Sequence, residues 1–270
     1  KNGRDTRAMI YGKNCALIGA VHLQPLPGAA GYGGSIEAIL EEALSEAQLY
    51  KKAGFDGLIV ENTHDTPYLK GRVEPETVAA MTVIAGAIKH EVGLPLGLQI
   101  LAGANLEALA VAVSLGLDFI RAEGFVFAHV GDEGIHEACA PQLIRRRFEL
   151  QAQSIKIYVD IKKKHASHAL TEDVDLAETA RAADFFRADG VVVTGVRTGS
   201  APSLEELQEA RAAVELPVLI GSGVSPDNIA AFSSLADALI IGSYVKHDGR
   251  WQNKIDLKRC DQLLASLPGR

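Results

Sequence analysis

The sequence is poor in cysteine and in positive charge, and it has no long apolar run. Its three cysteines, Cys15, Cys139 and Cys260, are widely spaced and form no CxxC motif, which excludes a disulfide framework and a zinc motif. A reducing compartment is therefore expected, and we predict a cytoplasmic location. Lysine and arginine number 27 against 34 aspartates and glutamates. Because nucleic acids and anionic membranes are bound mainly through an excess of basic residues, neither is an expected partner. The apolar stretches are interrupted by glycine or charge, so no membrane span is predicted.

Eight apolar runs of strand length alternate with eight stretches of helical pattern along the chain. The expected strands cover residues 16–22, 57–61, 95–101, 118–121, 155–161, 190–194, 218–221 and 238–242. The expected helices cover residues 35–53, 75–91, 105–115, 136–151, 174–188, 204–214, 226–235 and 255–267. No Ser/Pro/Gly-rich linker divides them, so the pattern predicts one α/β domain over residues 15–270, a single-domain (β/α)8 TIM barrel. Residues 1–14 are polar and lack a signal-peptide core. We interpret them as an N-terminal extension that caps the barrel bottom or is partly mobile.

A doubly wound sheet is the competing architecture. Its first strand–helix turn would carry a glycine fingerprint for a dinucleotide. In the first turn here, VHLQPLPGAAGYGGS, the glycines follow two prolines and do not stand directly at the start of the following helix. The barrel is therefore the favoured fold.

Two strand-like runs near the end of the chain, VLIGSGVSPDNI and ALIIGSYVK, both end in Gly-Ser. Either turn alone is more often only a tight turn. In a barrel, however, the loops after the seventh and eighth strands commonly hold phosphate. Glycine there permits positive φ and lets a ligand approach bare N–H groups. We predict a phosphate cradle formed by Gly195, Gly221, Ser222, Gly223, Gly242 and Ser243.

Polar side chains are expected in a ring at the C-terminal ends of six strands. Because side chains alternate in direction along a strand, the apolar positions 157, 159 and 161 leave Tyr158, Asp160 and Lys162 facing the barrel axis. Active sites of barrel enzymes occupy this end. The same reasoning on the other strands gives the ring His22, Glu61, Gln99, Arg121, Asp160 and Thr194.

The ring has two other interpretations. Arg121 with Glu61 or Asp160 can be a structural ion pair, although buried charge on so many strands is costly unless it is paired or used. The carboxylates and the imidazole can also hold a divalent metal, but no HxH or ExxH spacing supports this, and no cofactor is predicted. General acid and base chemistry is favoured, with burial raising the pKa of one carboxyl group.

Two loops extend this candidate site. The run KKKH, residues 162–165, follows the fifth strand and is either a solvated charged face or a loop that turns Lys164 and His165 onto the site. The segment AEGFVFAHVGDEGIHEA after the fourth strand is longer than usual. It is either an ordinary insertion or a lid that closes over a ligand.

Together these motifs resemble the BtpA family. The similarity covers residues 16–256 and includes ALIGAVHLQPLPG, DGLIVENTHDTPY, DFIRAEGFVFAHVGDEG, VDIKKKHASHAL, VVVTGVRTGSAP, LIGSGVSPDNI and IIGSYVKHDGRW. The resemblance implies a phosphate-binding (β/α)8 barrel. It does not fix an activity, because the family name comes from a role in photosystem I biogenesis while many members belong to organisms without photosynthesis.

Two functions follow as hypotheses. The first is an enzyme, an isomerase or a lyase or glycosidic-cleavage enzyme, acting on a sugar phosphate or nucleotide-like compound. Its predicted catalytic residues are His22, Glu61, Arg121, Asp160, Lys164 and His165. Its predicted substrate-binding residues are Asn62, Gln99, Glu123, His129, Asp132, Thr194 and Thr198. The second is a non-catalytic assembly or stability factor. A homo-oligomer is compatible with either.

Overall fold

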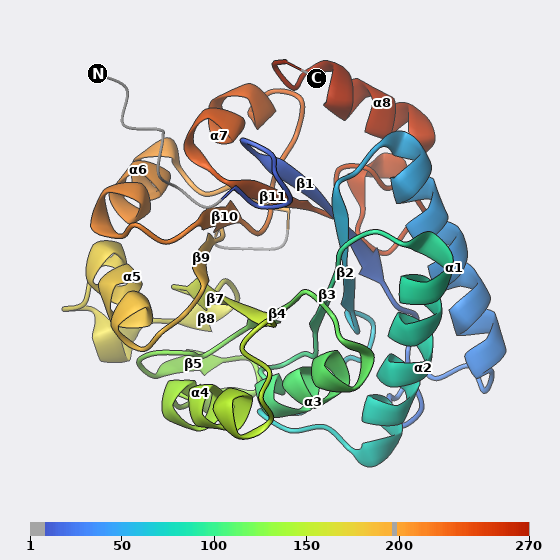
Figure 1. The fold of residues 1–270 in the computed structure, drawn as a ribbon, viewed down its shortest axis with the longest axis horizontal. Helices are drawn as coiled ribbons and strands as arrows, with labels where there is room; N and C mark the ends of the chain where they lie inside the picture. Colours follow the sequence, from blue (N-terminus) through green and yellow to red (C-terminus); the bar gives the residue numbers. More distant parts are fainter. Residues whose placement is uncertain (1–8, 196–198, 270) are drawn as a thin grey trace.

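The computed structural model describes residues 9–195 and 199–269 and forms a closed barrel of eight parallel strands. Neighbouring strands follow the order β1-β11-β10-β9-β7-β4-β3-β2 around the barrel (Figure 1). This arrangement confirms the predicted TIM barrel. The strands are β1 (Ala16–His22), β2 (Gly57–Glu61), β3 (Leu96–Gln99), β4 (Phe119–Ala122), β7 (Lys156–Ile161), β9 (Gly190–Val193), β10 (Val218–Ile220) and β11 (Ala238–Ile241).

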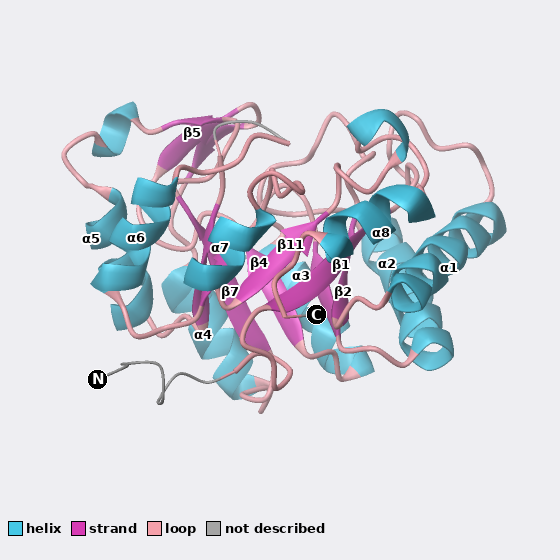
Figure 2. Cartoon of the chain, turned by 90° about the horizontal axis from the view of Figure 1, so that it is seen from above, coloured by secondary structure: helices cyan, strands magenta, loops and turns pink. Residues whose placement is uncertain are grey.

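Helices surround the barrel, one after each barrel strand (Figures 1 and 2). Local signals set their ends: Ser35 caps the first helix by accepting from the Ala38 N–H, and Gly54 ends it with φ 94°. In the described part of the chain, no helix combines the length and the apolarity that crossing a bilayer requires. The helices are α1 (Ile36–Ala53), α2 (Pro75–Val92), α3 (Asn105–Leu115), α4 (Ala140–Glu149), α5 (Leu176–Phe185), α6 (Leu204–Ala213), α7 (Ile229–Leu235) and α8 (Leu257–Ala265).

The barrel strands are buried on both faces, as expected for a parallel sheet covered by helices. One set of their side chains packs with the helices, and the alternate set, including Ile18, Ile59 and Phe119, fills the barrel interior. Ile10 packs against the interior set from the N-terminal side, with Tyr11 beside it. The two alternating sets confirm which positions of each strand face inward.

Two helices begin three or more residues later than the sequence pattern predicted. The helix expected from residue 136 begins at Ala140, because residues 129–136 form a hairpin. The helix expected from residue 226 begins at Ile229, because Asn228 holds the preceding residues in a turn: its Oδ1 accepts from the Ser225 N–H and its Nδ2 donates to the Gly223 carbonyl.

A small antiparallel sheet lies beyond the C-terminal ends of the barrel strands (Figure 2). Its strands are β5 (His129–Gly131), β6 (Gly134–His136) and β8 (Ala166–Ser167), in the order β6-β5-β8. It joins the long segment after β4 to the loop after β7, which the sequence did not reveal as partners. This sheet extends one side of the barrel beyond the C-terminal ends of the strands. The short 3-10 helices η1 (Ala169–Thr171) and η2 (His247–Gly249) complete the described elements.

Candidate active site

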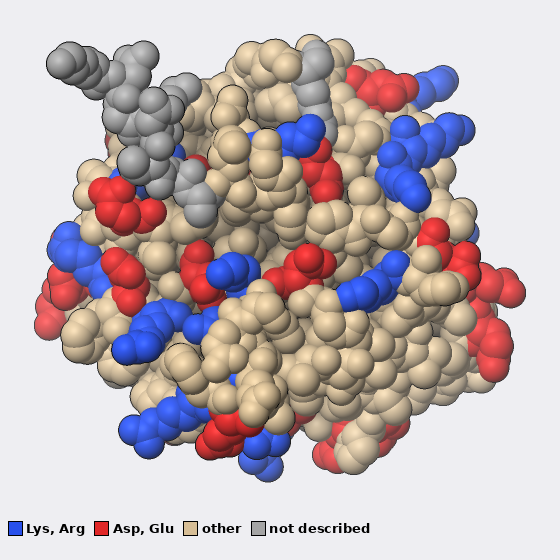
Figure 3. Space-filling model, viewed as in Figure 1, with Lys and Arg blue, Asp and Glu red and all other residues tan. Residues whose placement is uncertain are grey.

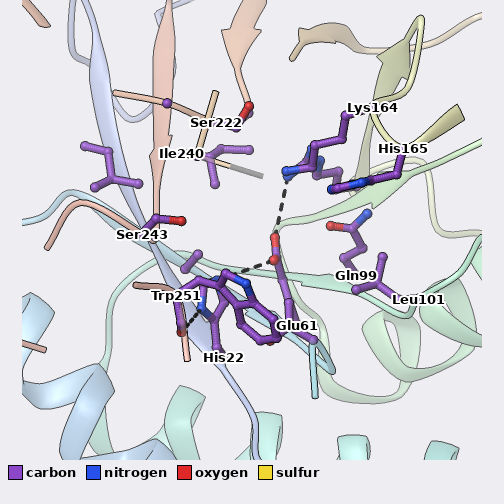
Figure 4. A pocket seen from close by; sticks show the side chains of 18 of the residues that line it. His22, Glu61, Gln99, Leu101, Lys164, His165, Ser222, Ile240, Ser243 and Trp251 are labelled. Carbon is purple, nitrogen blue, oxygen red and sulfur yellow. Dashed lines mark hydrogen bonds and ion pairs between the residues drawn. The ribbon is translucent and has the colours of Figure 1, made fainter. Parts of the chain in front are cut away.

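A cavity of about 620 Å³ opens at the C-terminal ends of the barrel strands (Figure 4). Side chains from opposite sides of the barrel meet there, because parallel strands all end at the same rim. Thirteen of the residues predicted from the sequence line it: His22, Glu61, Gln99, Arg121, Glu123, Asp132, Lys164, His165, Gly221, Ser222, Gly223, Gly242 and Ser243.

Strand register sets the geometry of one wall. His22 pairs with Glu61 across β1 and β2, and Glu61 pairs with Gln99 across β2 and β3. All three are inward positions at the last residue of their strands. The wall is therefore rigid, since each side chain projects from a hydrogen-bonded strand.

His22 is held in one tautomer. Its Nδ1 lies 3.1 Å from the Trp251 carbonyl oxygen, which can only accept, so Nδ1 carries the proton and Nε2 is left as an acceptor. Burial lowers the pKa of His22 well below its usual value, and the nearby Lys246 ammonium lowers that pKa further. His22 is thus a neutral imidazole at neutral pH. Its Nε2 lies 3.8 Å from Glu61 Oε2.

Glu61 has the environment of a general acid. Burial raises the pKa of Glu61, opposed by the positive charges of Arg121 and Lys164. Its Oε1 is buried without a hydrogen-bond partner in the described part of the chain and lies 3.6 Å from Arg121 Nη1. A carboxyl group whose pKa is raised by burial and which has an unused oxygen is suited to exchange a proton with a ligand.

Asp160 serves Arg121 and does not reach the cavity lining. Its Oδ1 accepts from Arg121 Nη2 at 2.9 Å and from Nε at 3.2 Å, and its side chain is 2% exposed. The sequence placed Asp160 among the catalytic residues. The geometry favours the structural alternative, in which Asp160 orients the guanidinium that faces the cavity.

The strand-end glycines Gly221 and Gly242 leave room for the side chains of Arg121 and His22. Both occupy inward positions, where a Cβ would lie 2.8 Å from Arg121 Nη2 and 2.9 Å from His22 Nε2, respectively. Neither has positive φ; among the predicted phosphate-binding glycines only Gly223 does, at 74°. The expectation of positive φ at these strand ends was therefore wrong for Gly221 and Gly242, where close approach is what requires glycine.

Backbone N–H groups of the turns after β10 and β11 line part of the cavity. Among the residues that the structure describes, the N–H groups of Gly223, Val224, Ser243 and Tyr244 have no hydrogen-bond acceptor, and all four residues line the cavity. Such a set favours an anion. The Ser222 hydroxyl is already used, since it donates to the Ser200 carbonyl and accepts from the Gly195 N–H.

Gly195 and three other predicted residues lie outside the cavity lining. Gly195 packs against Ser200. Asn62 is a structural residue: its side chain bonds Asp65 and the Leu101 N–H. Thr194 is buried, with a hydroxyl that has no partner in the described part of the chain. His129 lies beneath the small sheet, stacked on His136 at 4.9 Å. Thr198 falls outside the described residues.

The KKKH run turns its side chains in different directions. Lys162 has φ 52°, and its ammonium group donates to the carbonyls of Thr171 and Val174, so the expectation that it faces the barrel axis was wrong. The left-handed residue breaks the strand alternation. Lys163 points to Glu123 at 3.5 Å and Glu133 at 3.8 Å, beneath the small sheet. Lys164 reaches the cavity, and His165, with φ 54°, is at its exposed edge.

Sequence reasoning missed several lining residues. Trp251 is the most informative: its ring lies 6.0 Å from that of His22 and 4.7 Å from that of His64, at the cavity wall. It is the single tryptophan of the chain and ends the GSYVKHDGRW motif, which was a usable signal. Tyr68, Lys163 and Glu133 also line the cavity; they lie in the motifs DGLIVENTHDTPY, KKKH and DFIRAEGFVFAHVGDEG, but none was predicted as a site residue.

The buried pair of Lys246 and Glu46 supports His22 from below. Lys246 is fully buried, and its ammonium group bonds Glu46, whose Oε1 also accepts from the His22 backbone N–H at 3.2 Å. Burial lowers the pKa of Lys246. For a metal, no group of three His, Cys, Asp or Glu residues within residues 9–195 and 199–269 has a suitable arrangement.

The chain belongs to the BtpA family, whose sequence profile matches residues 13–268. It is 46% identical over 256 residues to an uncharacterised mitochondrial protein of Caenorhabditis elegans, covering 93% of this chain and 92% of that one. It is 37% identical over 252 residues to the photosystem I biogenesis protein BtpA of Synechocystis, covering 93% and 87%. Among solved structures it is similar to orotidine 5'-monophosphate decarboxylase of Methanocaldococcus jannaschii bound to the inhibitor BMP, with a TM-score of 0.59 at 15% identity, covering 94% and 98%.

Proposed function

We propose that this BtpA-family barrel is an enzyme that binds a phosphorylated small molecule and performs acid–base chemistry on it. The supporting observation is the arrangement of a single cavity. Unpaired backbone N–H groups of the turns after β10 and β11 line the same cavity as a neutral His22 beside a Glu61 of raised pKa. The first suits a phosphate, and the second suits proton transfer. The similar decarboxylase, which acts on a nucleoside monophosphate by its name, shares only the fold and adds weight to this substrate class.

The roles of the residues follow from their hydrogen bonds. Protonated Glu61 donates to an oxygen of the substrate, and His22 accepts a proton at Nε2, since its Nδ1 proton is held by Trp251. The Arg121 guanidinium, oriented by Asp160, stabilises the negative charge that develops between them. This set of groups is suited to isomerisation of a sugar phosphate, or to lyase or glycosidic cleavage of a sugar phosphate or nucleotide-like compound.

The phosphate grip supplies binding energy remote from the reacting atoms. Such energy orients the substrate and is recovered as a lower activation barrier. A grip built from backbone N–H groups needs no excess of basic residues, which agrees with the net charge of −7. On the face shown in Figure 3, acidic and basic side chains are likewise interspersed.

A phosphate titration followed by amide NMR tests the grip directly. We expect inorganic phosphate to shift the amide resonances of Gly223 and Ser243. The amides of Gly54 and Gly93, which end helices at the opposite end of the barrel, are the controls and stay unchanged. A ligand at about 100 times its dissociation constant also stabilises the fold by about 2.7 kcal/mol, measurable by thermal shift. If millimolar phosphate moves neither amide, the proposed substrate class is wrong.

A non-catalytic assembly factor is the second candidate, favoured by the similarity to the Synechocystis photosystem I biogenesis protein. This function does not need the acid–base pair. A Glu61→Gln variant that keeps full function in a cell-based complementation assay would support it, whereas loss of function with an intact fold supports the enzyme. Light scattering tests the homo-oligomer, which stays a prediction.

A further inference from the structure

The lysines at the barrel mouth differ in what they contact. Lys162 donates to two backbone carbonyls, Lys163 faces Glu123 and Glu133, and Lys246 bonds Glu46. Each of these ammonium groups is therefore occupied within the protein. Lys164 alone has no ion pair or hydrogen bond to any residue that the structure describes, and it lines the cavity.

The direction of Lys164 follows from the backbone around it. Lys162 and His165, the residues on either side of the Lys163–Lys164 pair, both have positive φ, at 52° and 54°. Non-glycine residues rarely adopt this conformation. Both side chains line the cavity, but Lys163 points to Glu123 and Glu133, whereas Lys164 points toward the carboxyl group of Glu61 (Figure 4).

The surroundings of Lys164 favour a free amine. Burial lowers the pKa of Lys164, and the Arg121 guanidinium lowers that pKa further, against the opposing carboxylates of Glu61 and Asp160. An uncharged amine is a nucleophile, whereas an ammonium group is not. Each unit by which the pKa falls increases the fraction of free amine at neutral pH about tenfold.

We infer that Lys164 forms an imine with the carbonyl group of a phosphorylated aldehyde or ketone. The inference rests on the proposed function, since the phosphate held by the N–H groups near Gly223 and Ser243 delivers the carbonyl carbon to Lys164 in the same cavity. It narrows the substrate class to sugar phosphates in the carbonyl form. It also gives Lys164 a role that is distinct from charge pairing.

The step balances with the groups present. The Lys164 nitrogen adds to the carbonyl carbon, the C=O electron pair moves to oxygen, and Glu61 protonates that oxygen while the nitrogen returns a proton to His22 Nε2. The proton on His22 Nε2 then passes to the Glu61 carboxylate, 3.8 Å away. The carbinolamine loses water: the C–O bond breaks as Glu61 gives this proton to the hydroxyl group, the nitrogen lone pair forms C=N, and the Glu61 carboxylate takes the proton that remains on the nitrogen. The net change is amine plus carbonyl giving imine plus water, and water reverses it to release product. The imine withdraws electrons from the neighbouring carbon, which assists isomerisation or C–C cleavage.

Borohydride trapping tests the inference. The protein is incubated with glyceraldehyde 3-phosphate or dihydroxyacetone phosphate, reduced with sodium borohydride, digested and analysed by mass spectrometry. We expect the reduced adduct on Lys164 and little on Lys163, because the Lys163 ammonium group is paired with Glu123 and Glu133. Glyceraldehyde and dihydroxyacetone, which lack phosphate, label Lys164 much less. Lys164→Arg abolishes the adduct, whereas the matched Lys163→Arg variant retains it, and both keep the positive charge.

Binding is measured separately, so that failure of imine formation at Lys164 can be distinguished from failure of phosphate binding. The same phosphorylated probes are titrated against the Gly223 and Ser243 amides in wild type and in Lys164→Arg. If the amides shift but borohydride leaves Lys164 unmodified, the imine is refuted and the phosphate site stands. If adducts spread equally over exposed lysines, the imine is also refuted. If neither amide shifts, the proposed function fails, and the imine inference fails with it.

Discussion

Asp160→Asn is the substitution that best separates a structural carboxylate from a catalytic one. Asp160 and Arg121 are almost completely buried, at 2% and 4% side-chain exposure, and are joined by hydrogen bonds of 2.9 to 3.3 Å. The substitution keeps the shape of the side chain and one acceptor oxygen but removes its charge. Among the described residues, the Glu61 carboxyl group at 3.6 Å is then the acidic side chain left beside the buried Arg121 guanidinium.

The expected loss of stability follows from that burial. Removing one partner of a buried ion pair costs about 3–5 kcal/mol, because the remaining charge stays desolvated. The retained amide oxygen and the proximity of Glu61 place the expectation at the lower end, about 3 kcal/mol. For a chain of this size each kcal/mol lowers Tm by about 2–4 °C. We therefore expect Tm to fall by roughly 6–12 °C.

Denaturant unfolding followed by circular dichroism measures this effect. The control is Asp227→Asn, an exposed aspartate in the turn before α7, which changes the free energy of unfolding by less than about 0.5 kcal/mol. An Asp160→Asn variant that unfolds within about 1 kcal/mol of wild type would refute the structural role and return Asp160 to the catalytic candidates.

Three further predictions concern the cavity. In Gly242→Ala, the new Cβ would lie 2.9 Å from His22 Nε2, so we expect the His22 ring to move. We expect 15N NMR of the imidazole to report loss of the fixed Nδ1–H tautomer, and an unchanged imidazole spectrum would contradict the packing argument. Because the pKa of His22 is lowered on folding, its contribution to stability is complete above pH 6.5 and is lost as the pH falls below that value. His22→Asn should therefore reduce the slope of the unfolding free energy against pH by up to about 1.4 kcal/mol per pH unit between pH 6.5 and 5. The exposed His90→Asn is the control, and an equal slope in the wild type and His22→Asn would show that His22 does not resist protonation. Trp251 is the only tryptophan and lines the cavity, so glyceraldehyde 3-phosphate should quench its fluorescence at the concentrations that shift the Gly223 amide; emission unchanged at saturation would place the ligand elsewhere.

The alternation of apolar strands and amphipathic helices determined the barrel, because buried parallel strands and their covering helices have distinct hydrophobic patterns. Strand period two also placed His22, Glu61, Gln99 and Arg121 on the inner face, as the structure has them. Along a regular strand, the direction of a side chain depends only on its neighbours in the sequence, so the sequence alone was sufficient.

Tertiary structure decided everything that depends on contacts between distant segments. The pairing of β5 with β8 joins two loops that are separated by a whole helix and strand, and no local pattern records such a pairing. The positive φ of Lys162 ended the strand alternation, which separated the directions of three consecutive lysines. Asp160 and Glu61 looked equivalent in sequence, yet the first is bound by Arg121 and the second keeps an oxygen without a hydrogen bond in the described part of the chain. A carboxyl group's chemistry depends on its solvation and its charged neighbours, and only the folded chain brings those neighbours together.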